Sequence, residues 1–406
     1  HQDAQGRASA LNHEDIDRDF EFVRDLGCNF LRLAHYPHND YAFRKCDELG
    51  IIVQTEIPWV NVCGENVKDE YFENIHSQMR EMVGSLYNHP SIVFWGMWNE
   101  LDQWGNKPGI YQGNFNPQRV VKESAILYSL AKELDPERYT GLTDDSVFQR
   151  PGYSSLKGDF FSDNRYNGWY YKIGDFSGLT KDMKEIQKTM GVTNLSEYGA
   201  GVNPYCHSWD RSVSNSLSSP YAAKHFEAYG NRFHESHLQQ ILDMPFLNFT
   251  SLWILFDFPV ANRKEGYLDS SDGVNFVENP ERMYMNDKGL VTRDRKLKKD
   301  VYFLYRALWN KSDETVYITE RRLESMPAGT EYYLTVYSNA PALELFINGQ
   351  SKGRLGASGE RSGVIWTFGP LVMGSGVETI KVVSPSGKSD EIVRKPMLLK
   401  QDNGLK

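Results

Sequence analysis

The first 310 residues alternate short apolar segments with stretches that have the spacing of amphipathic helices. The apolar segments are rich in β-branched and aromatic residues, which predicts strands buried on both faces. Strands that alternate with helices predict a parallel sheet covered by helices. The expected strands are residues 29–34, 51–55, 92–95, 139–143, 159–162, 192–196 and 249–255.

The number of strand–helix repeats predicts the fold class. Seven strands that alternate with helices fit an α/β fold with a closed, TIM-type (β/α)8 barrel better than an open sheet. A seven-stranded open sheet is the alternative. A closed barrel needs eight strands, and the absent strand is the first, because the chain begins with a polar loop that leads into the helix expected at 13–26. We therefore expect the first barrel strand to be missing from this chain.

The sequence changes character after residue 310. Short segments of alternating apolar and polar residues follow, separated by turn sequences such as Asn348-Gly349. This pattern predicts a set of antiparallel strands in an all-β, immunoglobulin-like sandwich. We expect two domains, a barrel over residues 1–310 and a β-sandwich over residues 315–406.

Charge and composition exclude several kinds of partner. The formal net charge of -9 argues against nucleic acid and against an anionic membrane surface. No apolar run approaches the length of a membrane-spanning helix. The four cysteines are too scattered for a disulfide framework or a zinc site. Nothing in the sequence indicates a cellular compartment.

Two glutamates follow expected strands where barrel enzymes carry their chemistry. Glu100, preceded by Asn99, follows one apolar segment, and Glu197 follows the segment that begins at residue 192. The carboxyl ends of barrel strands meet at one face, so these carboxylates can face one another. Retaining glycosidases need such a pair about 5 Å apart, one to attack the anomeric carbon and one to donate a proton. A helix cap with a solvated Glu100 is the plainer interpretation.

Further polar side chains collect at the same face. Arg32 and His35 lie at the end of the first expected strand, and Asn164 and Tyr166 follow the strand at 159–162. Taken alone, Arg32 could form a surface ion pair and Tyr166 could pack in the core. Polar groups at the ends of several separate strands favour a shared site instead. Because a nucleophilic carboxylate must be ionised, we expect positive charge and hydrogen-bond donors near one glutamate.

Four motifs give the chain a specific resemblance. They are Arg32-Leu-Ala-His35-Tyr-Pro37, Trp98-Asn-Glu100, Asn164-Arg-Tyr166-Asn-Gly-Trp-Tyr170 and Ser196-Glu-Tyr-Gly199. In this order they resemble glycoside hydrolase family 2, which contains β-galactosidases, β-glucuronidases and β-mannosidases. The resemblance runs from the first residue to about Trp309.

The resemblance implies a role for each of these residues. Glu100 would be the acid/base and Glu197 the nucleophile, held by Arg32 and Tyr166. Asn99 would bond the 2-hydroxyl of the sugar. The other residues implied to bind the substrate are His35, Asn164 and Trp253, the last as the floor of the sugar pocket, with a buried core tryptophan as the alternative.

The chain departs from the family pattern in two ways. Larger members bind magnesium through an acid-x-His pair after the third strand, whereas this chain has Glu56-Ile-Pro-Trp-Val-Asn61 there. We therefore expect no metal and no cofactor. Family members also carry two domains before the barrel, so we expect this chain to be a fragment of a longer enzyme.

The segment Asn286-Asp-Lys288 bears on the choice of sugar. It resembles the Asn-x-Lys pair by which β-glucuronidases hold the substrate carboxylate, a charge that a lysine ammonium suits. The nearby Phe256-Asp-Phe258 and Arg263-Lys-Glu-Gly266 look more like β-galactosidases, in which a similar Asn-Asp-Lys occurs. A surface salt bridge is the plain alternative for Lys288. We therefore expect a galactosidase, with β-glucuronidase as the alternative.

The leading hypothesis is a retaining exo-β-glycosidase that hydrolyses terminal non-reducing β-D-galactosides. Two alternatives lie outside this class of enzyme. One is a catalytically inactive carbohydrate-binding barrel, and the other is an endo-acting polysaccharide hydrolase, because glutamates at these two strands recur in several barrel families. The linkage, the aglycone and a homo-oligomeric state stay open.

Overall fold

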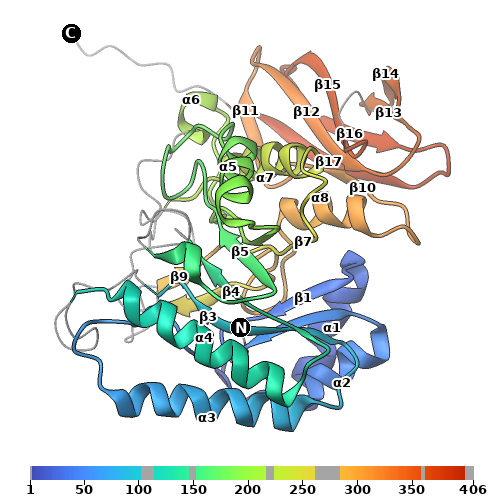
Figure 1. Cartoon of the computed structure of the whole chain (residues 1–406). Coiled ribbons are helices and arrows are strands. Elements are labelled where there is room, and N and C mark those ends of the chain that lie inside the picture. Colours follow the sequence, from blue (N-terminus) through green and yellow to red (C-terminus); the bar gives the residue numbers. More distant parts are fainter. Residues whose placement is uncertain are drawn as a thin grey trace.

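The computed structural model describes residues 2–101, 114–145, 152–215, 224–260, 284–357 and 362–397. It has two parts, visible in Figure 1 as an α/β part coloured from blue to yellow and a β part in orange and red beside helix α8. No helix within those ranges is long and apolar enough to span a membrane.

The α/β part is built on one parallel sheet of seven strands. Each strand pairs with the next one along the chain, in the order β1 to β7, and every pair is parallel. The expected TIM-type barrel is thereby confirmed, with seven strands in the part of the chain that the structure describes. The strands are β1 (Phe30–Leu33), β2 (Ile52–Glu56), β3 (Ile92–Asn99), β4 (Tyr139–Asp144), β5 (Phe160–Asn164), β6 (Asn194–Glu197) and β7 (Phe249–Thr250).

Helices follow the strands and cover the sheet. In α1 the capping box of Asn12 and Asp15 fixes the first turn, and Gly27, at φ 77°, ends the helix in a left-handed conformation. Helix α7 begins at Glu227, directly after its N-cap residue Phe226. The helices are α1 (His13–Leu26), α2 (Asp40–Leu49), α3 (Asp69–Leu86), α4 (Pro117–Leu134), α5 (Leu179–Met190), α6 (Arg211–Ser214), α7 (Glu227–Leu242) and α8 (Asp300–Trp309), with the 3-10 turn η2 (Tyr153–Ser155).

The last barrel strand is shorter than the sequence predicts. β7 contains only two residues, although the apolar run continues to Leu255. Beyond the strand, the Ser251 and Trp253 amides bond to the carbonyls of Leu195 and Tyr198. The chain therefore continues along β6 and its extension without completing a regular ladder.

The sheet is open between β1 and β7 in the described structure. A cavity of about 690 Å³ lies there, lined mainly by apolar side chains of α1, β1 and the segment around β7. Phe30 and Phe249, the first residues of the two strands, stack across the gap with ring centroids 4.2 Å apart. Side chains, rather than a backbone ladder, thus bring the two edges together at this end.

The β part is a sandwich of two sheets, which confirms the expected immunoglobulin-like architecture. One sheet has the order β10-β12-β15 and the other β11-β17-β16-β13-β14. Their facing side chains form one apolar core around Trp366 and Leu343. The strands are β10 (Val316–Ile318), β11 (Ser325–Pro327), β12 (Glu331–Ser338), β13 (Ala342–Ile347), β14 (Gln350–Gly356), β15 (Ile365–Val372), β16 (Glu378–Val383) and β17 (Ser389–Met397).

The boundary between the two parts lies in a short connection. Helix α8 ends at Trp309 and β10 begins at Val316. We propose residues 310–315 as the domain boundary. A small hairpin of β8 (Phe258–Val260) and β9 (Tyr284–Asn286) belongs to the α/β part and leads into the segment that carries Lys288.

Candidate active site

The polar residues predicted to gather at the barrel mouth do lie together there. They come from the carboxyl ends of five strands, or directly after them, as expected for a barrel of this type. The group consists of Arg32 and His35 (β1), Glu56 (β2), Asn99 and Glu100 (β3), Asn164 and Tyr166 (β5) and Glu197 (β6), connected by the hydrogen bonds described below.

Arg32 is the centre of this group. Its guanidinium donates to Oε1 of Glu197 at 2.6 Å, to Oε1 of Glu56 at 2.8 Å and to Oδ1 of Asn99 at 2.8 Å. The side chain is only 3% exposed. A buried arginine between two carboxylates holds both in place and compensates their charge.

Glu197 is surrounded by hydrogen-bond donors. Arg32 donates to Oε1, and the Tyr166 hydroxyl donates to Oε2 at 2.7 Å. Nε2 of His35 lies 3.8 Å from Oε1. Burial and then the negative charge of Glu197 raise the pKa of Tyr166 well above its usual value, so the hydroxyl keeps its proton and remains a donor. Both carboxylate oxygens of Glu197 therefore have partners suited to the ionised form.

Glu100 has the opposite environment. Its Oε1 accepts a hydrogen bond from the side-chain amide of Asn164, at 2.6 Å. Burial, followed by the negative charges of Glu197 and Asp145, raises the pKa of Glu100 well above the usual value. The residue also has φ 46°, a left-handed conformation that is uncommon outside glycine and that is often found at functional sites.

Glu56 is a member of the site that the sequence analysis did not predict as one. It is fully buried at the end of β2 and accepts from Arg32, while Nδ1 of His35 lies 3.3 Å away. Burial alone would raise the pKa of Glu56, but the charge of Arg32 and the contact with His35 outweigh it and lower this pKa. The available signal was its position, at the end of a strand like the other site residues.

No group of three or more His, Cys, Asp or Glu side chains in the described ranges could hold a metal ion. At the place where larger relatives have their acid-x-His pair, Glu56 is engaged by Arg32 instead.

Trp253 borders the site. Its ring stacks on that of His35, with centroids 4.8 Å apart and an interplanar angle of 18°, and packs edge-on against Phe258. Trp253 is 8% exposed. It thus extends the site with an apolar wall next to His35.

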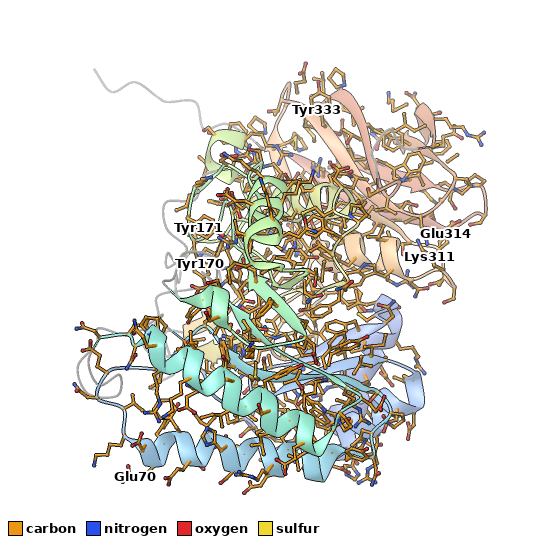
Figure 2. The ribbon with its side chains drawn as sticks, in the orientation of Figure 1. Glu70, Tyr170, Tyr171, Lys311, Glu314 and Tyr333 are labelled. Carbon is orange, nitrogen blue, oxygen red and sulfur yellow. The ribbon has the colours of Figure 1, made fainter. Side chains whose placement is uncertain are left out.

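Lys288 lies in an aromatic enclosure that includes Tyr166, the tyrosine bonded to Glu197. Its ammonium donates to the Tyr170 hydroxyl at 2.7 Å and lies 5.9, 5.3 and 4.8 Å from the ring centroids of Tyr166, Trp169 and Tyr170. Lys288 is 2% exposed, so the surface salt bridge considered for it is excluded. Figure 2 labels Tyr170 on the left of the view, and Lys311 and Glu314 on the right.

The rest of the segment around Lys288 is also buried. Asn286 is 4% exposed, and its Oδ1 accepts from the amide of Lys288 at 3.3 Å. Tyr166 connects this segment with the carboxylates, because its hydroxyl bonds to Glu197 while its ring lies under the ammonium of Lys288. Arg263 to Gly266, which weighed in the choice of sugar, lies outside the described residues.

A barrel whose mouth holds one carboxyl with a raised pKa beside another that is surrounded by donors has the arrangement that retaining glycosidases require. The family model "Glycosyl hydrolases family 2, TIM barrel domain" matches residues 1–312. The chain belongs to glycoside hydrolase family 2.

Three proteins similar to this chain are named as β-glucuronidases or as a β-galactosidase. A β-glucuronidase of Bacteroides fragilis is 33% identical over 97% of this chain and 52% of its own length. A Bacteroides fragilis structure provisionally named a β-galactosidase has 31% identity and a TM-score of 0.79 over 98% of this chain and 54% of that one. Bacteroides uniformis β-glucuronidase 2, covalently bound to cyclophellitol-6-carboxylate aziridine, has 27% identity and a TM-score of 0.76 over 98% and 45%. The chain therefore spans about half the length of these relatives.

Proposed function

We propose that this chain is the catalytic part of a retaining exo-β-glucuronidase, in which Glu197 is the nucleophile and Glu100 the acid/base. The observation that carries the assignment of roles is the contrast between the two carboxyls. Glu197 accepts from Arg32 and Tyr166, whereas Glu100 has a raised pKa. A retaining mechanism needs this difference, one carboxylate ionised for attack and one carboxyl protonated for donation.

In the first step Glu197 attacks the anomeric carbon while Glu100 donates its proton to the leaving oxygen. The Arg32 guanidinium and the Tyr166 hydroxyl hold Glu197 in place by donating hydrogen bonds to its two carboxylate oxygens. Burial and the charge of Glu197 favour the protonated form of Glu100 before the aglycone leaves. The bond between the sugar and its aglycone breaks, and a covalent glycosyl-Glu197 ester forms.

In the second step Glu100, now ionised, takes a proton from water, and the water attacks the anomeric carbon. The ester to Glu197 breaks and the sugar leaves with retained configuration. Once Glu197 is esterified, its negative charge no longer raises the pKa of Glu100, and so Glu100 holds its proton less strongly when it must act as a base.

The other site residues bind the sugar in this proposal. Asn99, fixed by Arg32 and Asn164, presents its amide to the 2-hydroxyl. His35 contacts the sugar, and Trp253 beside it forms the floor of the pocket. Asn164 also orients the proton donor through its bond to Glu100.

The choice of glucuronide rests on Lys288. Its ammonium is held among three aromatic rings, one of which, Tyr166, also touches the nucleophile. A desolvated ammonium there suits the carboxylate of a uronic acid, because charge-assisted bonds strengthen in a dry site. A galactoside has no charge at that position to balance the lysine.

The names of the relatives support the same choice. The B. fragilis relative that matches 97% of this chain is a β-glucuronidase, and the B. uniformis β-glucuronidase 2 is covalently bound to a cyclophellitol-6-carboxylate aziridine. We therefore reverse the preference of the sequence analysis, which placed galactoside first. β-Galactosidase remains the second candidate because of the B. fragilis structure that bears that provisional name.

The test compares aryl β-glucuronide with aryl β-galactoside on the full-length protein. We expect hydrolysis of the glucuronide, and we expect Lys288→Met to lose about 1.5–3 kcal/mol of the binding and transition-state free energy for it. Lys296→Met is the matched control, because that side chain is 83% exposed and pairs only loosely, at 3.9 Å, with Asp294.

Two results would contradict the proposal. Preference for the galactoside, unaffected by Lys288→Met, would return the first candidate. Tight binding of glucuronide or galactoside without any turnover would indicate the inactive carbohydrate-binding barrel.

A further inference from the structure

The turn that carries Lys288 is held by hydrogen bonds from two buried residues, His225 and Lys299, to Asp287. Asp287, fully buried, is contacted by Nδ1 of His225 at 2.9 and 2.8 Å from its two carboxylate oxygens. The ammonium of Lys299 donates to the Asp287 carbonyl at 2.7 Å and to the Val202 carbonyl at 2.7 Å. The position of Lys288 therefore depends on where His225 and Lys299 lie.

The side chains of Asp287 and His225 are closely packed. A Cβ atom added at Gly201 would lie 2.3 Å from Oδ1 of Asp287 and 2.6 Å from Nδ1 of His225. Trp169, which forms part of the enclosure of Lys288, packs edge-on against the His225 ring at 4.8 Å. A small displacement of His225 is thus passed on both to Asp287 and to the enclosure of the ammonium.

His225 and Lys299 each lie just before the start of a helix. His225 stands two residues before Glu227, the first residue of α7, and Lys299 caps α8 just before Asp300. The backbone amide of Asp300 donates to Oε1 of Glu227 at 3.0 Å, so the first turns of the two helices touch. Both acidic side chains are fully buried.

The β-sandwich ties these two helix starts together. Arg322, between β10 and β11, donates from Nε to Oε2 of Glu227 at 3.2 Å and from Nη2 to Oδ1 of Asp300 at 3.1 Å. The Tyr317 hydroxyl, also from the sandwich, donates to Asp300 at 2.6 Å. Burial and the charge of Asp300 raise the pKa of Glu227, which shows how close the two acidic groups are; Arg322 opposes that repulsion.

We propose that Arg322, in the sandwich, is a positioning residue for the substrate-binding lysine of the barrel. Arg322 fixes the first residues of α7 and α8. The starts of these helices set the positions of His225 and Lys299. His225 and Lys299 in turn hold the turn that carries Lys288. This inference rests on the proposed glucuronide specificity. Without touching the sugar, the sandwich thereby sets how well the enzyme recognises the substrate carboxylate.

A purely structural role of Arg322 and a positioning role predict different effects of its loss. Loss of a structural contact lowers the melting temperature and affects every substrate alike. Loss of a positioning contact reduces recognition of the carboxylate in particular, because only Lys288 is displaced relative to the two glutamates. The ratio of activities on a charged substrate and its uncharged counterpart separates the two.

The experiment uses the full-length protein with aryl β-glucuronide and the methyl ester of the same glucuronide. We expect Arg322→Met to lower kcat/KM for the glucuronide about ten-fold, mainly through KM, and to change that for the ester little. Arg322→Lys should recover part of the loss. Tyr337→Phe is the matched control, because Tyr337 bonds across the same junction to Glu235, within α7 rather than at its start, at 2.6 Å.

Each outcome decides something. Equal losses on both substrates, or a loss in Tyr337→Phe as selective as that in Arg322→Met, would overturn the inference. If Arg322→Met does not fold, Tyr317→Phe takes its place, with a smaller change of the same kind expected. If Lys288→Met leaves the discrimination between acid and ester unchanged, the proposed function fails as well; if it abolishes discrimination while Arg322→Met preserves it, only this inference fails.

Discussion

The ends of β6 and β3 carry the same kind of residue in two contrasting environments. Glu197, on β6, accepts hydrogen bonds from an arginine and a tyrosine. Glu100, after β3, has an amide as hydrogen-bond donor and the negative charges of Glu197 and Asp145 nearby. The proposed mechanism uses the first as the attacking carboxylate and the second as the proton donor. The role proposed for each glutamate thus depends on its neighbours.

The largest effect should come from removing the carboxylate at the end of β6. Glu197→Gln keeps the size of the side chain, and its amide oxygen can still accept from Arg32, but its NH2 group cannot accept from the Tyr166 hydroxyl and the amide cannot attack the anomeric carbon. We expect turnover to fall by more than about 10⁴-fold and covalent labelling by a fluorinated glycosyl inactivator to disappear, as followed by intact-protein mass spectrometry. Labelling that persists in this variant would show that the two environments have been assigned the wrong way round.

A smaller and more selective effect should follow at the end of β3. Glu100→Ala removes the proton donor, which contributes about 10²–10⁴-fold. The loss should be large for an alkyl glucuronide and much smaller for the dinitrophenyl glucuronide, since dinitrophenolate leaves without a proton. The slope of log kcat/KM against the pKa of the leaving group measures this. Equal losses for good and poor leaving groups would argue against Glu100 as the acid.

The smallest effect concerns the influence of the Glu197 charge on the pKa of Glu100. The first step needs protonated Glu100, so kcat/KM should decrease as the pH rises through the pKa of this group, by about ten-fold per pH unit. The charge of Glu197 helps to raise that pKa, so the pKa of Glu100 should be lower in Glu197→Gln. Carbon NMR of labelled glutamate follows it directly in both proteins. An equal or higher pKa in the variant would mean that the charge of Glu197 does not raise the pKa of Glu100.

Elements with strong local signals were predictable from the sequence. Helix α1 covers residues 13–26, as apolar periodicity predicts, between the cap residues Asn12 and Gly27. The strands β11, β14 and β17 were not predicted. β14 is mostly exposed and contains several polar residues and glycines, and so it has no apolar alternation to recognise. The pairing of such a strand depends on its partner in the sheet, β13.

The site was predictable as far as its residues end barrel strands. Arg32, Asn164, Tyr166 and both glutamates were found from their positions, and their contacts now explain why they occur together. The shared use of Arg32 by Glu56 and the enclosure of Lys288 by aromatic rings were not predictable, because both depend on side chains that are distant in sequence. For Lys288, the sequence alone allowed a surface salt bridge.

The opening between β1 and β7 has a consequence for hydrogen exchange. Within the described chain, β3 and β4 are bonded to strands on both sides, whereas β1 and β7 are each bonded on one side. Amide protons exchange fastest where the least structure must open, and a two-residue β7 beside an apolar cavity offers little resistance. Deuterium should therefore enter at β1 and β7 first and reach β3 and β4, in the middle of the sheet, last, so that the barrel unfolds locally from this opening.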